Sequence, residues 1–238
     1  MALPRLNEFP QYELIIPSTG ETINYRPFLV KEQKVLILAL ESQDQKQVLN
    51  AILNCIDACC EGVDSKNLAT FDVEYIFTQI RGKSVGESTK INVACGKCEE
   101  NNEVKIDLNK IALQENIDIK NKFVKLTDDI TVELKYPTYS EFMKKSNLET
   151  NLSANIVFQL MSACLEAVIL NDEERVSIKD ESAEEVENFI NSLTSEQFAK
   201  MQAFVEEIPK IHMDITFQCG SCEENNVRRL EGLTDFFS

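Results

Sequence analysis

The sequence CGKCEENN at residues 95–102 returns as CGSCEENN at residues 219–226, with seven of the eight positions identical. Each copy follows a strand-like segment, residues 89–94 and 212–218. A C-x2-C pair in a tight turn directs two sulfurs at one metal ion, whereas structural zinc takes four ligands. Neither copy has a further Cys or His close by in the sequence. The repeat therefore predicts one shared structural Zn2+, with two hairpins joined as a zinc-ribbon-like unit. Its predicted ligands are Cys95, Cys98, Cys219 and Cys222.

Two alternatives to a metal site remain open from the sequence. A thioredoxin-like redox pair has the same spacing, but it places the first cysteine at the start of a helix, where the thiolate is stabilised. Disulfides between the two copies, or cysteines of no role, are the second alternative. Gly96 and Gly220 follow the first cysteine of each copy and are expected to allow a positive φ angle in the turn. The remaining cysteines lie in apolar helical segments, and we expect them to be small buried residues. They are Cys55, Cys59, Cys60 and Cys164.

The segments that precede the two cysteine motifs also correspond, although more loosely. Residues 12–18 are echoed by residues 132–138, and a cysteine-bearing apolar helix is predicted in each half, at residues 52–60 and 156–164. A second helix follows each of these, and the predicted ranges are 71–81 and 195–207. We interpret the chain as two diverged repeats, residues 1–115 and 120–238, packed as one body. The predicted fold class is α+β, with mostly helices and a hairpin at each end of a repeat.

Turn residues and helical spacing predict the local elements. Residues 14–16 and 22–25 are separated by Pro-Ser-Thr-Gly and predict a hairpin, as do residues 123–126 and 130–134. Apolar residues at helical spacing predict a helix through residues 35–40. Two segments resemble capping boxes, in which a Ser or Thr and a Glu or Gln three residues later bond the open amides of a first turn. They begin at Thr138 and Ser195, and only the first has the strict spacing.

Composition excludes several classes of partner. The 238-residue chain is 43% hydrophobic and carries a formal net charge of −16, so it is expected to fold but not to bind nucleic acid or anionic membranes through basic patches. The N-terminus lacks the apolar core of a secretory signal, and the longest apolar run, residues 35–40, is too short to span a bilayer. We therefore expect a cytosolic protein with a protein partner. In that reducing compartment, eight cysteines indicate metal or redox chemistry more than a disulfide framework.

No catalytic constellation can be assembled from the sequence, so no enzyme activity and no small-molecule substrate are expected. Residues 81–84 (RGKS) resemble the end of a phosphate-binding loop, but position 77 is Phe where that motif needs Gly, and we interpret them as a plain loop. The only histidine, His212, is expected at the surface or half-buried, with a role beside the zinc as an alternative. The acidic residues 172–174 and 180–187 are expected to form a solvated face, which could equally serve as a docking surface for a basic partner. Phe236 and Phe237 are candidates for either a partner anchor or internal packing.

The whole sequence resembles a known family, the base-plate hub subunits of T-even-like contractile-tailed bacteriophages, including their cyanophage relatives. The resemblance rests on MALP at residues 1–4, YEL at 12–14, PSTG at 17–20 and YRPFLVKEQKVL at 25–36, and it extends to the C-x2-C turns. It implies a non-enzymatic protein made in the host bacterial cytoplasm and needed to build the central hub of the base plate. The implied partners are other phage tail and base-plate hub proteins. Both a virion subunit and an assembly chaperone absent from the virion fit this role. A zinc-ribbon nucleic-acid-binding or redox protein is the alternative of another class.

Overall fold

The computed structural model describes residues 9–113, 122–141, 153–171 and 173–237. The MALP string at residues 1–4 and the acidic residue at position 172 lie outside these ranges. The described chain is a mixed α/β protein with seven α-helices and four small antiparallel sheets, which confirms the predicted fold class at that level. Two compact units can be distinguished. The first comprises residues 1–65, 71–117 and 209–238, and the second comprises residues 66–70 and 118–208.

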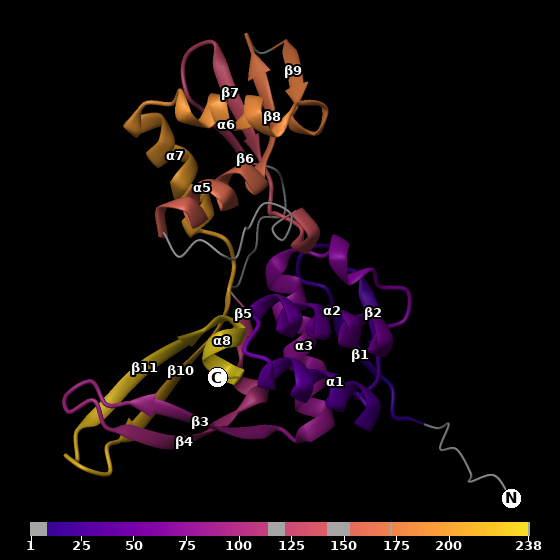
Figure 1. The fold of residues 1–238 in the computed structure, drawn as a ribbon, viewed down its shortest axis with the longest axis vertical. Helices are drawn as coiled ribbons and strands as arrows, with labels where there is room; N and C mark the ends of the chain where they lie inside the picture. Colours follow the sequence, from indigo (N-terminus) through magenta and orange to yellow (C-terminus); the bar gives the residue numbers. More distant parts are fainter. Residues whose placement is uncertain (1–8, 114–121, 142–152, 172, 238) are drawn as a thin grey trace, which may run out of the picture. The chain divides into compact units, whose positions relative to one another are not determined.

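The first unit begins with the predicted hairpin and three helices (Figure 1). Strands β1 (Tyr12–Ile15) and β2 (Thr22–Tyr25) pair antiparallel, and they are followed by α1 (Val30–Glu41), α2 (Gln45–Cys59) and α3 (Thr70–Val85). A short 3-10 turn, η1 (Ser65–Asn67), precedes α3. The predicted helices at residues 35–40, 52–60 and 71–81 are therefore confirmed. Apolar side chains of α3 are almost completely buried and form the centre of this helical part. They are Phe71, Val73, Ile76, Phe77 and Ile80.

The loop predicted at residues 81–84 is wrong, because these residues continue α3 to Val85. Gly82 is buried there, and a Cβ atom at this position would lie 3.9 Å from the Cβ of Leu108. Glycine in a helix interior costs about 1 kcal/mol relative to alanine. Packing of the rest of α3 outweighs that cost, so a local glycine does not end the helix.

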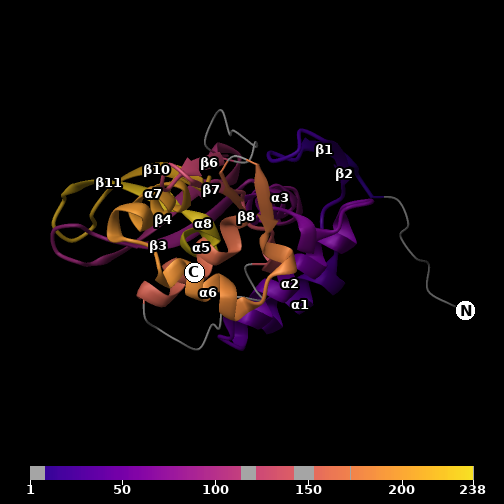
Figure 2. The ribbon, with the colours of Figure 1, turned by 90° about the horizontal axis from the view of Figure 1, so that it is seen from above.

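Two long hairpins complete the first unit, and Figures 1 and 2 both draw them side by side. The first consists of β3 (Ser88–Ala94) and β4 (Asn101–Asp107), followed by η2 (Leu108–Lys110) and the short β5 (Ala112–Leu113). The second consists of β10 (Ile211–Gln218) and β11 (Asn225–Glu231), followed by α8 (Gly232–Phe237). The start of β10 also pairs with β5.

One hydrophobic cluster explains why the C-terminal hairpin belongs to the first unit. Its buried members come from both hairpins, η2 and α8, and Phe236 of α8 is only 1% exposed. Phe236 therefore packs internally and is not a partner anchor. The other buried members are Ile91, Ile106, Leu108, Ile111, Ile211, Met213, Ile215 and Leu230. The compact units change between residues 117 and 118, inside the predicted gap at residues 115–120, but residues 209–238 return to the first unit and residues 66–70 belong to the second. The two-repeat interpretation itself stays a prediction.

Glu74 on α3 fastens the C-terminal segment to the helical part. The backbone amides of Leu233 and Ile211, at the starts of α8 and β10, favour the charged form of its carboxyl group and lower its pKa. Burial nevertheless raises the pKa of Glu74 from 4.5 to about 7, because desolvation of the charge exceeds the effect of these donors. A carboxyl group with a raised pKa in the folded state stabilises the fold fully below its ordinary pKa. That contribution is lost as the pH rises through about 7.

Replacing Glu74 by glutamine should therefore flatten the pH dependence of stability. Glutamine keeps an oxygen acceptor for the two amides but cannot ionise. Between pH 5 and pH 8, the free energy of unfolding of wild type should fall by about 2 kcal/mol relative to that of Glu74→Gln. Thermal denaturation of both proteins across this range measures the difference. Glu13→Gln, on an exposed position of β1, is the matched control and should run parallel to wild type.

In the described residues, the second unit contains a four-stranded antiparallel sheet and three helices, α5, α6 and α7. The sheet order is β6 (Lys122–Lys125), β7 (Ile130–Leu134), β8 (Leu165–Leu170) and β9 (Glu174–Ser177), so the hairpin predicted around residues 127–129 is confirmed. Helix α5 (Ser153–Cys164) contacts β8 as well as α6 (Ala183–Asn191) and α7 (Ser195–Glu206). The 3-10 turn η3 (Ile178–Asp180) joins β9 to α6. The β8–β9 hairpin has no counterpart in the predicted repeat pattern.

Both predicted capping boxes occur in this unit, but one of them begins one residue earlier than predicted. The Glu141 amide is bonded by the Thr138 hydroxyl, and the Glu141 carboxylate accepts from the Thr138 amide at 3.0 Å, as predicted. The cap of α7 is Thr194 with Gln197, not Ser195, so that prediction was wrong by one residue. Residues 180–187 carry a further capping box at the start of α6. Apart from Val186 they are exposed, which confirms a solvated acidic face.

A candidate metal centre at the hairpin tips

The two C-x2-C segments form the same turn at the ends of their hairpins. In the first, the Cys95 amide donates to the Glu100 carbonyl at 2.9 Å, and the Glu99 amide donates to the Cys95 carbonyl at 3.1 Å. The second turn repeats both bonds at the same two distances, from Cys219 to Glu224 and from Glu223 to Cys219. The shared sequence thus produces a shared backbone geometry.

The residues with positive φ in these turns are glutamates, which corrects the role expected of the glycines. Glu99 has a φ of 60° and Glu223 a φ of 58°, and neither Gly96 nor Gly220 lies in that region. Non-glycine residues seldom adopt this conformation, so an identical exception in both turns indicates that each turn is held by its surroundings.

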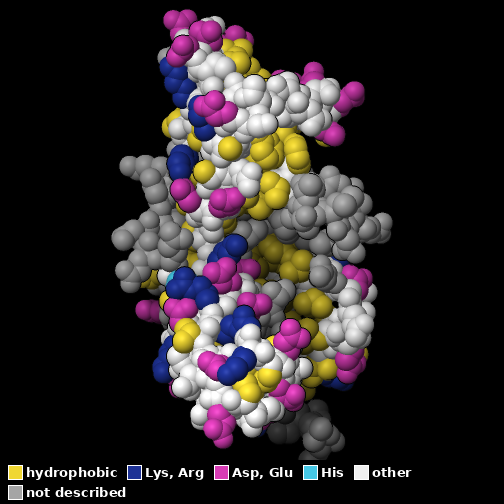
Figure 3. Space-filling model, turned by 90° about the vertical axis from the view of Figure 1, so that its left-hand side faces the viewer, with side chains coloured by type: hydrophobic (Ala, Val, Ile, Leu, Met, Phe, Trp, Pro, Cys, Tyr) yellow, Lys and Arg dark blue, Asp and Glu magenta, His cyan; other side chains and the backbone are white. Residues whose placement is uncertain are grey.

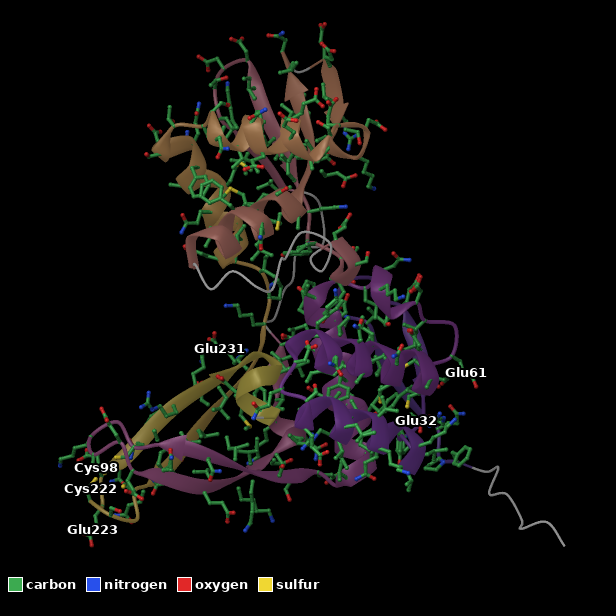
Figure 4. The ribbon with its side chains drawn as sticks, viewed as in Figure 1. Glu32, Glu61, Cys98, Cys222, Glu223 and Glu231 are labelled. Atoms are coloured by element: carbon green, nitrogen blue, oxygen red, sulfur yellow. The ribbon has the colours of Figure 1, made fainter. Side chains whose placement is uncertain are left out.

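The four predicted cysteines converge. Their Sγ atoms all lie within 4.8 Å of one another. Between the hairpins, the Sγ atoms of Cys95 and Cys222 lie 3.7 Å apart, and those of Cys98 and Cys219 lie 3.6 Å apart. A tetrahedral zinc ion bound at about 2.3 Å would separate its sulfurs by about 3.8 Å. Figure 4 shows Cys98 and Cys222 together at the end of the hairpins. The sulfur spacing therefore fits one tetrahedral thiophilic ion.

Two asparagines cross between the hairpins and bond the opposite turn. Asn226 of β11 accepts from the Gly96 amide at 2.8 Å, and its Nδ2 donates to the Cys95 Sγ at 3.5 Å. Asn102 of β4 accepts from the Gly220 amide at 2.9 Å, and its Nδ2 lies 3.7 Å from the Cys219 Sγ. Each hairpin therefore holds both the first cysteine and the following glycine of its neighbour.

This exchange gives the glycines a physical role that does not depend on φ. A Cβ atom at Gly96 would lie 3.4 Å from Oδ1 of Asn226, and one at Gly220 would lie 3.8 Å from Oδ1 of Asn102. Both separations fall within ordinary van der Waals contact, the first at its short limit. A Cβ atom would therefore touch the asparagine side chain, most closely at position 96.

Backbone amides also favour thiolates at the first cysteine of each turn. Amide donation from Cys98 and Lys97 lowers the pKa of Cys95 to about 6. The amides of Cys222 and Ser221 lower the pKa of Cys219 in the same way. The second cysteine of the first turn, Cys98, behaves differently. The Glu100 amide lowers its pKa, but hydrogen bonding to the neighbouring sulfurs and burial outweigh that effect and raise the pKa to about 12. Metal binding to such a cluster would release the remaining thiol protons.

Burial divides the four cysteines into an inner and an outer pair. Cys95 and Cys219 are each 1% exposed, Cys222 is intermediate, and Cys98 is exposed at the tip. An ion pair between Lys97 and Glu224, at 2.9 Å, also bridges the hairpins. Both of its side chains are largely exposed, so it contributes little to stability. Position 97 is also where the two motifs differ, since the second copy has Ser221 there.

The remaining sequence candidates lie away from this cluster. His212 pairs with Glu231 at the opposite end of the β10–β11 hairpin, about 23 Å along the strand from Cys219 at 3.3 Å per residue. A role for His212 beside the metal is therefore excluded. The four helical cysteines are all buried, as predicted. Asn102 and Asn226 were not among the residues predicted for the site, although both stand at the last position of the repeated octapeptide.

The fold and the site define a two-unit α/β protein whose paired hairpins end in a four-cysteine cluster. The chain belongs to the T4 bacteriophage base plate protein family, whose family model matches residues 9–238. Neither the curated proteins nor the solved structures contain a match. The resemblance predicted from the sequence is confirmed at the level of a T4-type base plate protein, and the hub assignment stays a prediction. Membership assigns the protein a structural role in the phage tail base plate, where its neighbours are other base-plate proteins. Among the described residues, no helix has the length and apolarity needed to cross a membrane.

Proposed function

We propose that this protein is a non-enzymatic component in the assembly of the base-plate central hub, and that its two C-x2-C hairpins are held together by one structural Zn2+. It would act either as a hub subunit or as an assembly factor that leaves before the virion is complete. Its partners would be other tail and base-plate hub proteins, and it would meet them in the host bacterial cytoplasm. The similarity of the two motifs supports an internal duplication as their origin.

The observation that carries the proposal is the convergence of four Sγ atoms within 4.8 Å from hairpins more than 100 residues apart. Four thiolates fill the coordination sphere of zinc and leave no position for water or substrate, which is typical of structural sites rather than catalytic ones. The crossing asparagines hold the inner sulfurs from outside the ligand set, as supporting residues around metal sites do. Membership of the T4 base plate protein family supports a structural use of these two joined hairpins in the phage tail.

The two alternative classes have less support. A redox pair is disfavoured because both motifs lie in hairpin turns, whereas thioredoxin-like cysteines start a helix. Nucleic-acid binding at the tips is disfavoured because Glu99, Glu100 and Glu223 are exposed there, on a chain of net charge −16. Figure 3 likewise shows Lys and Arg interspersed with Asp and Glu, without one continuous basic surface on the face drawn.

A phage that lacks this gene should assemble tails without a completed hub, and a plasmid copy of the wild type should restore plaque formation. Mass spectrometry of purified virions then separates the two roles, since peptides of this chain are expected in the virion only if it is a subunit. A complementing copy with Cys95→Ser should fail, whereas one with Cys164→Ala should succeed. Normal tails from the deletion phage would refute the proposed function.

A further inference from the structure

Helix α1 leaves an unusually apolar surface uncovered within the described chain. Val30 is 72% exposed and Leu38 is 64% exposed. Val35, Ile37 and Leu40 are each 45–49% exposed. Only Glu32 and Ala39 of α1 are buried, so the helix rests on α2 along a narrow stripe. Large exposed apolar surfaces on folded proteins mark interaction sites. We define the α1 face as the outward residues Lys31, Lys34, Val35, Ile37, Leu38, Leu40 and Glu41.

The helix is held in place from its inner side, which leaves the α1 face free to bind without rearrangement. The Glu32 carboxylate accepts from the Leu29 amide at 2.8 Å and from Arg26 at 2.9 Å. Arg26 also donates to the Ala58 carbonyl at the end of α2. These bonds fix the start of α1 against α2, so the outward side chains are presented on a rigid helix.

We propose that the α1 face binds a second copy of this chain, with the two α1 helices antiparallel about a two-fold axis between Ile37 and Leu38. In that register Ile37 lies beside the second copy's Ile37, and Leu38 lies beside its Leu38, on the two sides of the axis. Symmetry repeats each contact, because an isologous interface uses the same surface of both copies. Val35 and Leu40 lie on the two flanks of the helix and border this central apolar contact.

The charges on α1 select this partner and this orientation. The same register places Lys34 opposite the second copy's Glu41, and both side chains are exposed. Lys31 lies one turn before Lys34 and pairs with Glu32 of its own helix at 3.3 Å. Basic residues in the first half of the helix and acidic residues at its end are self-complementary only when the copies run antiparallel. Antiparallel helix dipoles favour the same arrangement.

The contact between two short helices is smaller than a standard stable interface, and the net charge of −16 on each copy opposes association. The dimer should therefore depend on concentration and become stronger as salt screens the overall repulsion. Sedimentation of the purified full-length chain should show a reversible monomer–dimer equilibrium. A chain that stays monomeric up to its solubility limit would overturn the proposal and leave the α1 face to another base-plate protein.

Charge reversal tests the register directly. Lys34→Glu and Glu41→Lys alone should each weaken self-association about ten-fold or more, because like charges then meet at two symmetric positions. An equal mixture of the two single variants should form a heterodimer, since every pair across its axis is again opposite in sign. The double variant Lys34→Glu/Glu41→Lys should recover the wild-type dimer. Failure of both the mixture and the double variant to associate would overturn the antiparallel register.

An apolar control separates this surface from others. Leu38→Asp should abolish the dimer, while Val227→Asp should leave it unchanged, because Val227 is 74% exposed on the distant strand β11. Both positions are at the surface, so circular dichroism should show an unchanged fold for each variant. Equal loss of association in the two variants would place the interface elsewhere and contradict the proposal.

Discussion

Replacing Cys95 by serine should release the metal from the purified chain and loosen both hairpins, although they are far apart in the sequence. Structural zinc bound by thiolates contributes on the order of 10 kcal/mol in small peptides, comparable with the roughly 5–15 kcal/mol net stability of a whole domain. Cys95 is an inner ligand, 1% exposed, and its sulfur also accepts from Asn226. Its loss removes one ligand and leaves that donor without its sulfur partner.

The effect should be local to the first unit. Hydrogen exchange should quicken in β3, β4, β10 and β11, while the sheet of the second unit keeps its protection. Elemental analysis after gel filtration should show the metal content falling to near zero. Cys164→Ala is the control, because Cys164 is fully buried in the second unit and should leave the metal content unchanged. Full metal retention in Cys95→Ser would argue against Cys95 as a ligand.

Replacing Asn226 by alanine should weaken metal binding without removing a ligand. The side chain is 8% exposed, accepts from the Gly96 amide at 2.8 Å and donates to the Cys95 sulfur and the Glu224 carbonyl. A buried amide left without its acceptor costs about 1–3 kcal/mol. Loss of a residue that supports a metal ligand typically lowers affinity about 10- to 100-fold. Competition with a zinc chelator measures the affinity.

The neighbouring residue provides a matched control for that experiment. Asn225→Ala changes the same residue type one position earlier, on the exposed side of β11, and should bind metal like wild type. Asn102→Ala, the counterpart in the first hairpin, should resemble Asn226→Ala, because it bonds Gly220 in the same way. Equal affinities for Asn225→Ala and Asn226→Ala would show that the crossing bonds do not support the site.

The cysteine cluster could be predicted from sequence because the C-x2-C spacing is a local property with a strict chemical meaning. The same local logic predicted the β1–β2, β6–β7 and cysteine hairpins. The crossing asparagines could not be assigned a role in this way. Asn102 and Asn226 are conspicuous in the repeat, but their partners lie in the other hairpin, so no local pattern indicates what they bond.

The features that the sequence analysis missed depend on contacts over long distances in the chain. Strand β8 begins at Leu165, directly after α5 ends at Cys164, and neither residue is a glycine or proline that would mark the change. A short apolar run there fits a helix or a strand equally well. Only its pairing with β7 and β9 decides the outcome. Likewise, assignment of residues 209–238 to the first unit depends on the shared hydrophobic cluster, to which Phe236 contributes from the end of the chain.

Quantitative elemental analysis of the purified, full-length chain is the most direct measurement of the central claim, that two hairpins share one metal ion. It should find one zinc per chain, together with loss of that zinc in both Cys95→Ser and Cys219→Ser. Two zinc ions per chain, or a folded chain without metal in which these serine variants are as stable as wild type, would contradict it.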